Sequence, residues 1–448
     1  MHHRNSGYWL RLVFVPLATA LIGTALAADW PPTLDGKNTT TQSVDGRTIE
    51  RYIHGPREAW GYKVNPAEWN YPPAQESAAP GQNHNSFYLV APKAPRDNAP
   101  LCVVLHSANR TAYDYLGYSS LNRKVDQSDE PAAAITNSPN DFYALYLNST
   151  NAEWWGWSQA QQSPNFPHVN APTPAELRVL DTIEWVVARC HIDRNRIYLC
   201  GMSMGGCGTL AIGLPHGDIF AAALASAPAG TEYASYRTSG FSMTGLPDPP
   251  VMVDFSSQTD NWSATQPPLV LAAQTGHLPL VLSWGPFGHT GSTRAIGKYP
   301  LCAVALAYPW LEIRKNEAYP VFTHASSDQR APWPAPPGGL DESGQTNALF
   351  RWKTQQDTPS SFAMQLWISH PAVPNPPALP DKATADVTLR RLQQFKVQAV
   401  RSYNWQLTSN GKPIASGKIT PDAENLLTIP GLTLTTGTAE LSVKSNGG

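Results

Sequence analysis

The residues best suited to chemistry lie in the segment 201–206, Gly-Met-Ser-Met-Gly-Gly, which contains a G-x-S-x-G pattern. The segment directly follows an apolar, strand-like run that ends at Cys200, and a run of small residues typical of a helix comes after it. A strand-turn-helix of this kind holds its serine in a strained, exposed conformation, and the positive end of the helix favours developing negative charge. We predict that Ser203 is a nucleophile; the alternative is a glycine-rich turn with a bystander serine.

A serine hydroxyl needs a base to remove its proton, and the base needs a carboxylate to orient it. In a strand-turn-helix hydrolase the chain order is serine, acid, histidine, each on a loop after a strand. Asp260 follows the strand-like run 251–255, and His289 follows the next such run in a glycine-flanked corner. We predict Asp260 as the acid, with Asp254 inside the strand as its rival, and His289 as the base. His277 precedes its strand and is expected at the surface.

Hydrolysis through a tetrahedral intermediate also requires two N–H donors for the oxyanion. The residue after the nucleophile, Met204, is expected to supply one of them. The loop after the apolar run 101–105 is expected to supply the other, from Ser107. His106 in the same loop is interpreted as a packing or hydrogen-bonding residue.

Tryptophans stand close to two of these loops. Trp154, Trp155 and Trp157 follow a strand-like run that ends near Leu147, at the carboxyl edge where ligands bind to open α/β sheets. Their faces, and that of Trp262 beside the acid loop, are predicted to contact substrate by stacking on a sugar ring or an aromatic acyl group. The alternative for the first group is that they roof the core.

The elements that must position these residues alternate between strand and helix. Continuous apolar runs are typical of parallel strands buried on both faces, and 174–190 has the spacing of an amphipathic helix. The pattern predicts an α/β fold of the α/β-hydrolase type, with a parallel-type sheet and helices on both faces. The strands are expected in these segments: 86–90, 100–105, 142–147, 196–200, 220–225, 250–255 and 278–284.

The pattern changes after about residue 320, where short strands follow one another without helices. Strands are expected at 362–368, 385–395, 403–408 and 439–443, and Asn410-Gly411 is a strong hairpin signal. We therefore expect a catalytic domain over 29–320 and a small antiparallel β-sandwich over 321–448.

The first residues, Met1 to Ala28, have the pattern of an export signal. A short cationic start precedes an apolar run, and Ala25-Leu26-Ala27 is typical of a cleavage site. The run is short for a membrane anchor, the alternative interpretation. The mature chain is therefore expected to be secreted or periplasmic, with no integral membrane association.

Composition restricts the partners. The chain has 32 Lys and Arg against 34 Asp and Glu, so it carries no basic footprint for nucleic acid. The five cysteines do not have metal-ligand spacing, and we expect no metal and no cofactor. An odd number of cysteines leaves at least one unpaired in a monomer. Cys102 and Cys200 lie in apolar strand-like runs and are expected to be small apolar side chains buried there.

The segment 196–206, with His191-Ile192-Asp193 before it, resembles the secreted esterase group of polyhydroxybutyrate depolymerases, feruloyl esterases and acetylxylan esterases, which is similar to carbohydrate esterase family 1. Prolyl-oligopeptidase-like hydrolases look similar at this turn too. The resemblance covers roughly residues 86–300, and it implies that Ser203, Asp260 and His289 form the triad.

Two departures from that group are visible. The oxyanion loop of the group has His-Gly where this chain has His106-Ser107, and a tannase-like branch has disulfide cysteines where this chain has Met202 and Gly288. The sandwich resembles fibronectin-like modules at the level of the fold.

The leading hypothesis is a serine esterase that forms an acyl-enzyme on a polymeric or plant-derived ester carrying acetyl, feruloyl or polyester groups. The alternatives are a prolyl-oligopeptidase-like serine peptidase and a non-catalytic polysaccharide-binding protein.

Overall fold

A computed structural model describes residues 32–34, 47–55, 86–108, 110–119, 138–149, 154, 172, 174–231, 246–289, 296–330 and 343–445. The expected export signal, Met1 to Ala28, lies outside these residues. Within them, no helix is both long and apolar enough to cross a bilayer.

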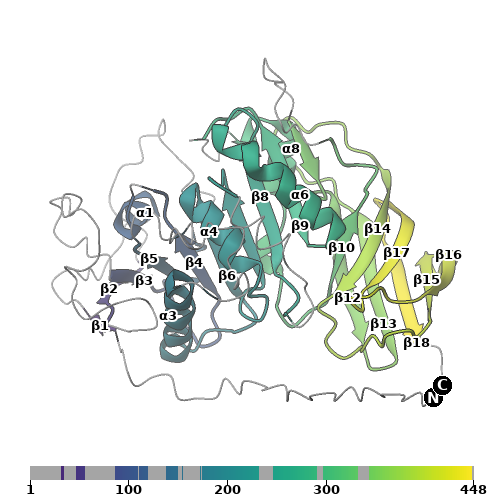
Figure 1. Cartoon of the computed structure of the whole chain (residues 1–448), viewed down its shortest axis with the longest axis horizontal. Coiled ribbons are helices and arrows are strands. Elements are labelled where there is room, and N and C mark those ends of the chain that lie inside the picture. Colours follow the sequence, from purple (N-terminus) through teal and green to yellow (C-terminus); the bar gives the residue numbers. More distant parts are fainter. Residues whose placement is uncertain are drawn as a thin grey trace, which may run out of the picture.

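The large sheet runs through the N-terminal two thirds of the described chain (Figure 1). Its neighbouring strands from β5 to β9 are parallel, and the strands toward its two edges are antiparallel. Across the sheet the order of the described strands is β1 (Thr33–Leu34), β2 (Ile49–Ile53), β3 (Ser86–Val90), β5 (Tyr143–Leu147), β4 (Leu101–Leu105), β6 (Ile197–Met202), β7 (Ala222–Ser226), β8 (Val251–Ser257), β9 (Leu280–Gly285) and β11 (Gly344–Thr346).

The strands that the sequence predicts from 86 to 284 are confirmed to within a few residues. Each of them is buried along its whole length, because helices cover both faces of a parallel sheet. This explains why they appear in the sequence as continuous apolar runs without alternation.

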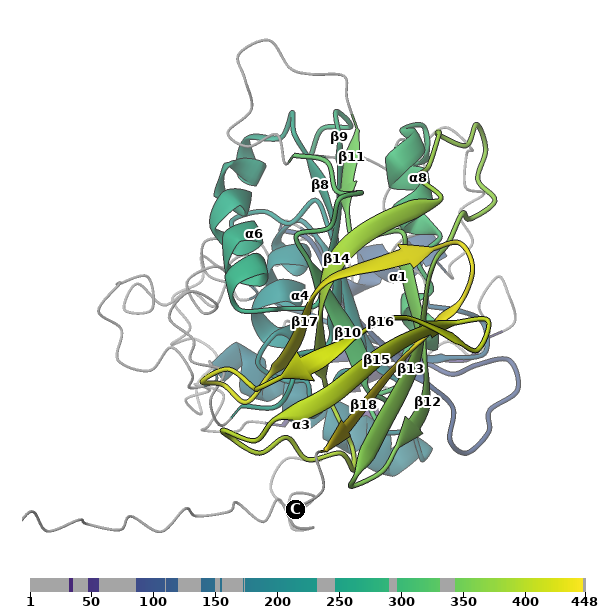
Figure 2. The same cartoon turned by 90° about the vertical axis from the view of Figure 1, so that its right-hand side faces the viewer.

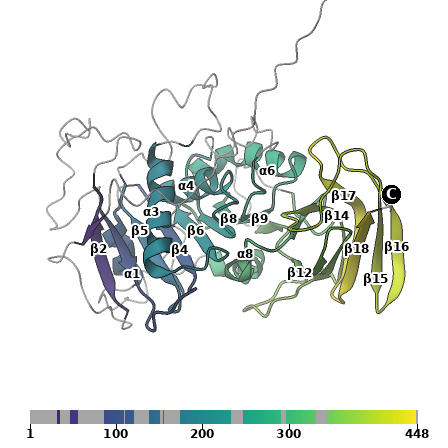
Figure 3. The same ribbon diagram turned by 90° about the horizontal axis from the view of Figure 1, so that it is seen from below.

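Helices cover the two faces of this sheet (Figure 3). On one face lie α3 (Pro174–Cys190), α4 (Met204–Gly213) and α6 (Gln266–Thr275), whose apolar side chains share a core with one side of the strands. On the other face lie α1 (Ala112–Ser119) and α8 (Pro300–Leu306). The predicted parallel-type sheet with helices on both faces is therefore confirmed.

Two antiparallel sheets follow and pack face to face around a third apolar core (Figure 2). The hairpin predicted at Asn410-Gly411 joins β15 to β16, and both residues have a positive φ, as a type I′ turn requires. Among the described residues, one sheet is β10 (Tyr319–Thr323), β14 (Lys382–Arg390) and β17 (Leu427–Thr435). The other is β12 (Phe350–Asp357), β13 (Ser361–Ile368), β18 (Ala439–Ser445), β15 (Tyr403–Ser409) and β16 (Lys412–Ile419).

The strand expected at 385–395 ends earlier, at Arg390. The next residue, Arg391, has a φ of 55°, which turns the chain out of the extended conformation. Its guanidinium then donates to the main-chain oxygens of Ala221 and Pro249, so the end of β14 is fastened to the amino ends of β7 and β8.

The path of the chain links the two parts more closely than a simple division at residue 320. That position falls inside β10, which already belongs to the sandwich, and β11 then returns to pair antiparallel with β9 of the large sheet. Only after β11 does the chain build the five-stranded sheet.

Candidate active site

The turn between β6 and α4 gives Ser203 an unusual backbone. Its φ of 57° and ψ of −119° lie where side chains other than glycine are strained. Glycine is required on both sides of it. A Cβ on Gly201 would lie 2.4 Å from the carbonyl oxygen of Gly205, and a Cβ on Gly205 would lie 2.1 Å from that of Leu105. The segment 201–206 is therefore a sharp elbow that presents Ser203 beyond the carboxyl end of β6.

Three polar side chains meet at that elbow through hydrogen bonds. The Ser203 Oγ lies 2.7 Å from His289 Nε2, and His289 Nδ1 lies 2.5 Å from Asp260 Oδ2. Asp260 follows β8 and His289 follows β9, so both loops emerge at the carboxyl edge of the sheet together with the elbow. The structure thus brings together the three residues that the sequence predicts to act together.

The environment of the three side chains suits proton transfer. Ser203 and Asp260 are buried, whereas the imidazole of His289 is 30% exposed and so remains open to a substrate. The second carboxylate oxygen of Asp260 accepts the Trp262 backbone N–H at 3.0 Å, because Asp260 caps the short helix η6 (Asn261–Thr265). This cap fixes the carboxylate while its other oxygen faces the imidazole.

Asp254, the rival acid, lies elsewhere. Its side chain is fully buried within β8 and accepts a hydrogen bond of 2.8 Å from the Ser256 hydroxyl, which in turn accepts one from Gln266. Burial raises the pKa of Asp254 to about 7, and the hydrogen bonds from Ser256 and Gln266 only partly oppose that rise. Asp254 therefore supports the strand beneath the acid loop and does not face His289.

The corner that carries His289 is held by residues that sequence reasoning missed. The backbone N–H of Gly288 donates to the hydroxyl of Ser257 at 2.8 Å and to that of Thr259 at 3.2 Å. Gly288 has a φ of 69°, which only glycine adopts without strain. Two hydroxyls of the acid loop thus set the position of the histidine loop, so the two loops are built as one unit.

The two predicted oxyanion donors differ in the hydrogen bonding of their N–H groups. Met204 opens α4, and the first N–H groups of a helix have no acceptor within it. The N–H of Ser107, in contrast, donates to the Tyr115 hydroxyl at 3.1 Å. The Ser107 hydroxyl lies 2.5 Å from the same oxygen and donates to the carbonyl of Met202. Tyr115, which sequence reasoning missed, therefore holds the loop of Ser107, the second predicted donor.

His106 and Trp154 serve the core of this region. The His106 ring is buried, with Nδ1 2.8 Å from the Ser107 oxygen and Nε2 2.9 Å from the backbone N–H of Ser149, which it accepts. This is the hydrogen-bonding role expected for it. Trp154 is also buried; its ring packs against His106 and lies under the Arg178 guanidinium. The expectation that Trp154 contacts substrate is therefore wrong, because the side chain roofs the core.

The other predicted tryptophans divide into two groups. Trp155 and Trp157 lie outside the described residues. Trp262 is 46% exposed, and the centre of its ring lies 6.5 Å from that of His289 at a tilt of 43°. An exposed aromatic face thus lies beside the imidazole of His289.

All five cysteines, each within the described chain, are free thiols. Cys102 and Cys200 are buried on adjacent strands with their sulfurs 3.7 Å apart, which fits the expected role as small apolar side chains. In the part of the chain that the structure describes, no group of three His, Cys, Asp or Glu side chains is arranged to hold a metal ion.

The order of the strands, the elbow after β6 and the loops after β8 and β9 together decide the fold. The chain has the α/β-hydrolase fold. Residues 179–249, which include the elbow, match the model of the Prolyl oligopeptidase family.

Both a protein sequence and solved structures are similar to this chain. A poly(3-hydroxybutyrate) depolymerase of Ralstonia pickettii is 31% identical over 183 residues, which are 38% of this chain and 35% of that protein. The chain thus matches about a third of the length of this curated relative. The chain is similar to this depolymerase and esterase group.

Among solved structures, an acetyl xylan esterase from Aspergillus awamori has a TM-score of 0.32 and 15% identity, over 46% of this chain and 89% of that one. An S-formylglutathione hydrolase from Agrobacterium tumefaciens has a TM-score of 0.36 and 13% identity, over 56% of this chain and 92% of that one.

Proposed function

We propose that this protein is a serine hydrolase of carboxylic esters that works through an acyl-enzyme. One observation carries the proposal, namely the continuous hydrogen-bond chain from Ser203 through His289 to Asp260. A hydroxyl, an imidazole and a buried carboxylate in this order form the constellation that activates a serine for acyl transfer.

In the first half of the reaction, His289 Nε2 takes the proton of the Ser203 hydroxyl as the Oγ attacks the ester carbonyl. Asp260 Oδ2 accepts the Nδ1–H, which holds the productive tautomer and stabilises the imidazolium. The tetrahedral intermediate then collapses, the imidazolium gives its proton to the leaving alcohol, and the acyl group stays on Ser203. Water repeats the same steps to release the acid.

The oxyanion is stabilised by the N–H of Met204 at the positive end of α4. Ser107 is the second proposed donor. In the free protein its N–H is engaged by Tyr115, so it serves the oxyanion only after turning from that hydroxyl toward the substrate.

We propose an ester that is polymeric or derived from plants as the substrate, and a secreted or periplasmic location. The depolymerase relative supports the first part, since its name specifies a polyester. The exposed ring of Trp262 beside His289 supports an acyl or alcohol group with a flat face. The export pattern of residues 1–28 supports the second part.

A serine peptidase is the second candidate, because residues 179–249 match the Prolyl oligopeptidase family. The same triad cleaves amides and esters, so the two candidates differ in the leaving group they accept. Parallel assays with p-nitrophenyl esters and with p-nitroanilides of short peptides separate them. Turnover of the anilides with untouched esters favours the peptidase.

The decisive experiment replaces the nucleophile. Ser203→Ala is expected to lower ester turnover by roughly 10⁶-fold and to abolish labelling by a fluorophosphonate. Ser442→Ala, a change in the C-terminal sandwich, serves as the matched control and is expected to leave both unchanged. Wild-type ester turnover by the Ser203→Ala protein would refute the proposal, and retained glycan binding by an unlabelled wild-type protein would favour a non-catalytic binding role.

A further inference from the structure

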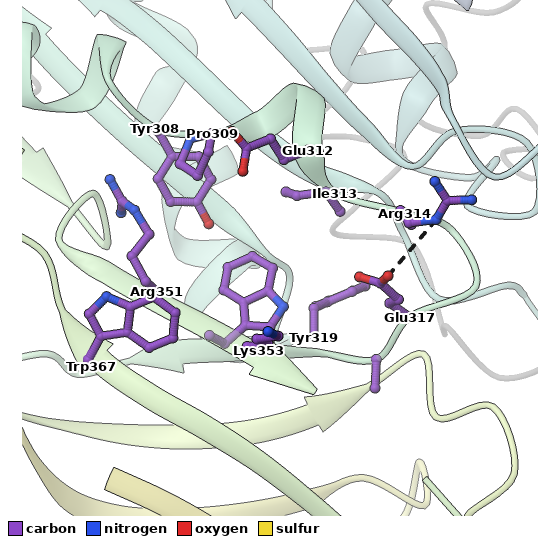
Figure 4. Close-up of a pocket in the computed structure, with 12 residues that line it drawn as sticks. Tyr308, Pro309, Glu312, Ile313, Arg314, Glu317, Tyr319, Arg351, Lys353 and Trp367 are labelled. Atoms are coloured by element: carbon purple, nitrogen blue, oxygen red, sulfur yellow. Dashed lines mark ion pairs between the residues drawn. The ribbon is translucent and has the colours of Figure 1, made fainter. Parts of the chain in front are cut away.

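A hollow of about 300 Å³ lies between the segment that follows α8 and the hairpin of β12 and β13 (Figure 4). On the catalytic side it is lined by Tyr308 and by the short helix η7 (Trp310–Glu312), and on the sandwich side by Arg351, Trp352 and Trp367. Its volume is at the small end of the range for ligand pockets, so it suits one or two rings.

This hollow is remote from the triad. The Tyr198 hydroxyl donates to the main-chain oxygens of Leu311 and Ile313, which places η7 beside the amino half of β6. Ser203 lies beyond the carboxyl end of that strand, five residues later. At about 3.3 Å per residue, roughly 17 Å of strand separates the two places. The reaction proposed above therefore makes no use of the hollow.

A buried cation with unused donors faces the hollow. Arg351 is only 8% exposed, and its Nη1 donates to the main-chain oxygens of Ala348 at 2.7 Å and Phe350 at 2.9 Å. The remaining N–H groups of its guanidinium make no hydrogen bond to any residue within the described ranges. Figure 4 shows the guanidinium beside Tyr308, and the distance from Arg351 Cζ to the centre of that ring is 4.6 Å.

Aromatic rings form the rest of the wall. Trp367 pairs with Arg351 across the two strands, so both side chains lie on the same face of the sheet. The Trp352 ring lies near that of Tyr308, with ring centres 6.4 Å apart at a tilt of 46°. Both tryptophans are only half-buried, so each keeps part of its surface open to a ligand.

The polar groups at the rim have both signs. Glu312 offers an acceptor, and Lys353 offers a donor in addition to those of Arg351. A metal ion or an organic cation would meet Arg351, and a simple anion would meet Glu312. An aliphatic polyester has acceptors alone and would leave the Glu312 carboxylate without a donor. A ring bearing hydroxyls supplies donors and acceptors together, and its C–H face packs on tryptophan.

The hollow continues into a second one of about 270 Å³, which shares Trp352, Lys353 and Glu317 with the first. This extension is lined by polar side chains, of which Asn316, Glu317 and Lys353 are exposed. The Asp357 carboxylate in its wall already accepts backbone N–H groups of the segment 393–395. A track that begins with aromatic walls and continues with these exposed amide, carboxylate and ammonium groups suits a chain of sugars better than a single one.

We propose that the groove between η7 and the β12–β13 hairpin is a non-catalytic binding site for a polysaccharide, with a pyranose ring packed on Trp367 and held by hydrogen bonds to Arg351 and Glu312. The site holds the protein on a polymer while the triad works at a separate place. It does not depend on the reaction that the triad performs.

The test measures binding and catalysis separately on the full chain. Isothermal titration with xylo-, cello- and manno-oligosaccharides is expected to show binding of at least one series, and a hydroxybutyrate oligomer is expected to show none. Trp367→Ala and Lys353→Ala are expected to weaken the binding, the former by about tenfold. Turnover of a p-nitrophenyl ester is expected to stay at the wild-type rate in both variants.

Trp405→Ala is the matched control, because Trp405 is a half-buried tryptophan of the same sheet, on β15, away from the groove. It is expected to bind saccharide as the wild-type protein does. The proposal is overturned if no saccharide series binds, if Trp367→Ala binds with unchanged affinity, or if Trp405→Ala loses binding equally. A wild-type protein that binds no saccharide but hydrolyses the ester refutes this site alone, whereas a wild-type protein that binds saccharide but leaves the ester intact refutes the proposed reaction alone.

Discussion

A single methyl group at Gly205 tests whether the elbow sets the active-site geometry. In Gly205→Ala the new Cβ would lie 2.1 Å from the carbonyl oxygen of Leu105, whereas ordinary contacts begin at 3.4 Å. The end of β4 and the first turn of α4 must therefore separate by about 1.3 Å. Because β4 leads into the loop of Ser107 and α4 begins with Met204, this displacement is expected to separate the two proposed oxyanion donors.

A misplacement of about 1 Å lowers rates by roughly 100-fold, and overpacking destabilises by about 1–3 kcal/mol. We expect kcat/KM of Gly205→Ala for a p-nitrophenyl ester to fall by at least that factor, with a lower Tm. The matched control is Gly213→Ala at the other end of α4, where the new Cβ would lie 3.5 Å from Ala223, an ordinary contact. Its rate should stay within twofold of the wild-type rate. A folded Gly205→Ala protein with the wild-type rate would refute the reasoning.

Three further outcomes are expected. Asp260→Asn should lower kcat by about 10⁴-fold in an ester assay, because the imidazole of His289 loses its orienting carboxylate. Asp254→Asn should keep its activity in the same assay. Similar losses in both variants would contradict the choice of Asp260 as the acid. Burial lowers the pKa of His216, but the nearby carboxylate of Asp218 and the hydrogen bond to Glu176 outweigh it and raise the pKa to about 9. Protonated His216 therefore stabilises the folded protein fully below about pH 6.5, and this contribution of up to about 3 kcal/mol is lost as the pH rises to about 9. Denaturant titrations of His216→Gln should show a free energy of unfolding that changes less over this pH range. Asp248→Ala should destabilise the protein by about 3 kcal/mol in urea unfolding, because it leaves the buried guanidinium of Arg390 without its carboxylate partner at 2.8 Å. An unchanged unfolding midpoint would show that this ion pair does not hold the sandwich to the large sheet.

The sequence predicts the central strands well for a physical reason. Strands covered on both faces must be apolar throughout, and the runs from 86 to 284 satisfy this condition without help from distant residues. In contrast, the outer part of strand β12 alternates between half-buried and exposed positions, and strand β16 is largely exposed. Their residues therefore give little hydrophobic signal in the sequence. Helix α6 begins Gln-Pro-Pro, and that start hides it from a search for helical periodicity.

The hydrogen-bonded set of Ser203, His289 and Asp260 could be predicted because its members follow strands in a fixed order along the chain. The residues that hold the loops of Ser107 and Gly288 in place could not be predicted, because their side chains meet only after the chain has folded. Tyr115 reaches the N–H of Ser107 from α1, and Ser257 reaches the N–H of Gly288 from the end of β8. Trp154 shows the same limit, because a tryptophan in a loop gives no sign in the sequence of whether it faces the core or the solvent.

The return of the chain through β11 bears on how the protein can be dissected. A fragment that stops at residue 320 would lack β11 and would split β10, which leaves the hydrogen-bonding groups of β9 exposed along one side. Trp284 would also lose the cover of Gly344, whose Cα lies so close to the indole that a methyl group there would stand 2.1 Å from it. The unpaired edge of β9, beside an exposed indole, can form hydrogen bonds with a strand of another molecule. The isolated hydrolase portion is therefore expected to aggregate instead of folding as an autonomous enzyme.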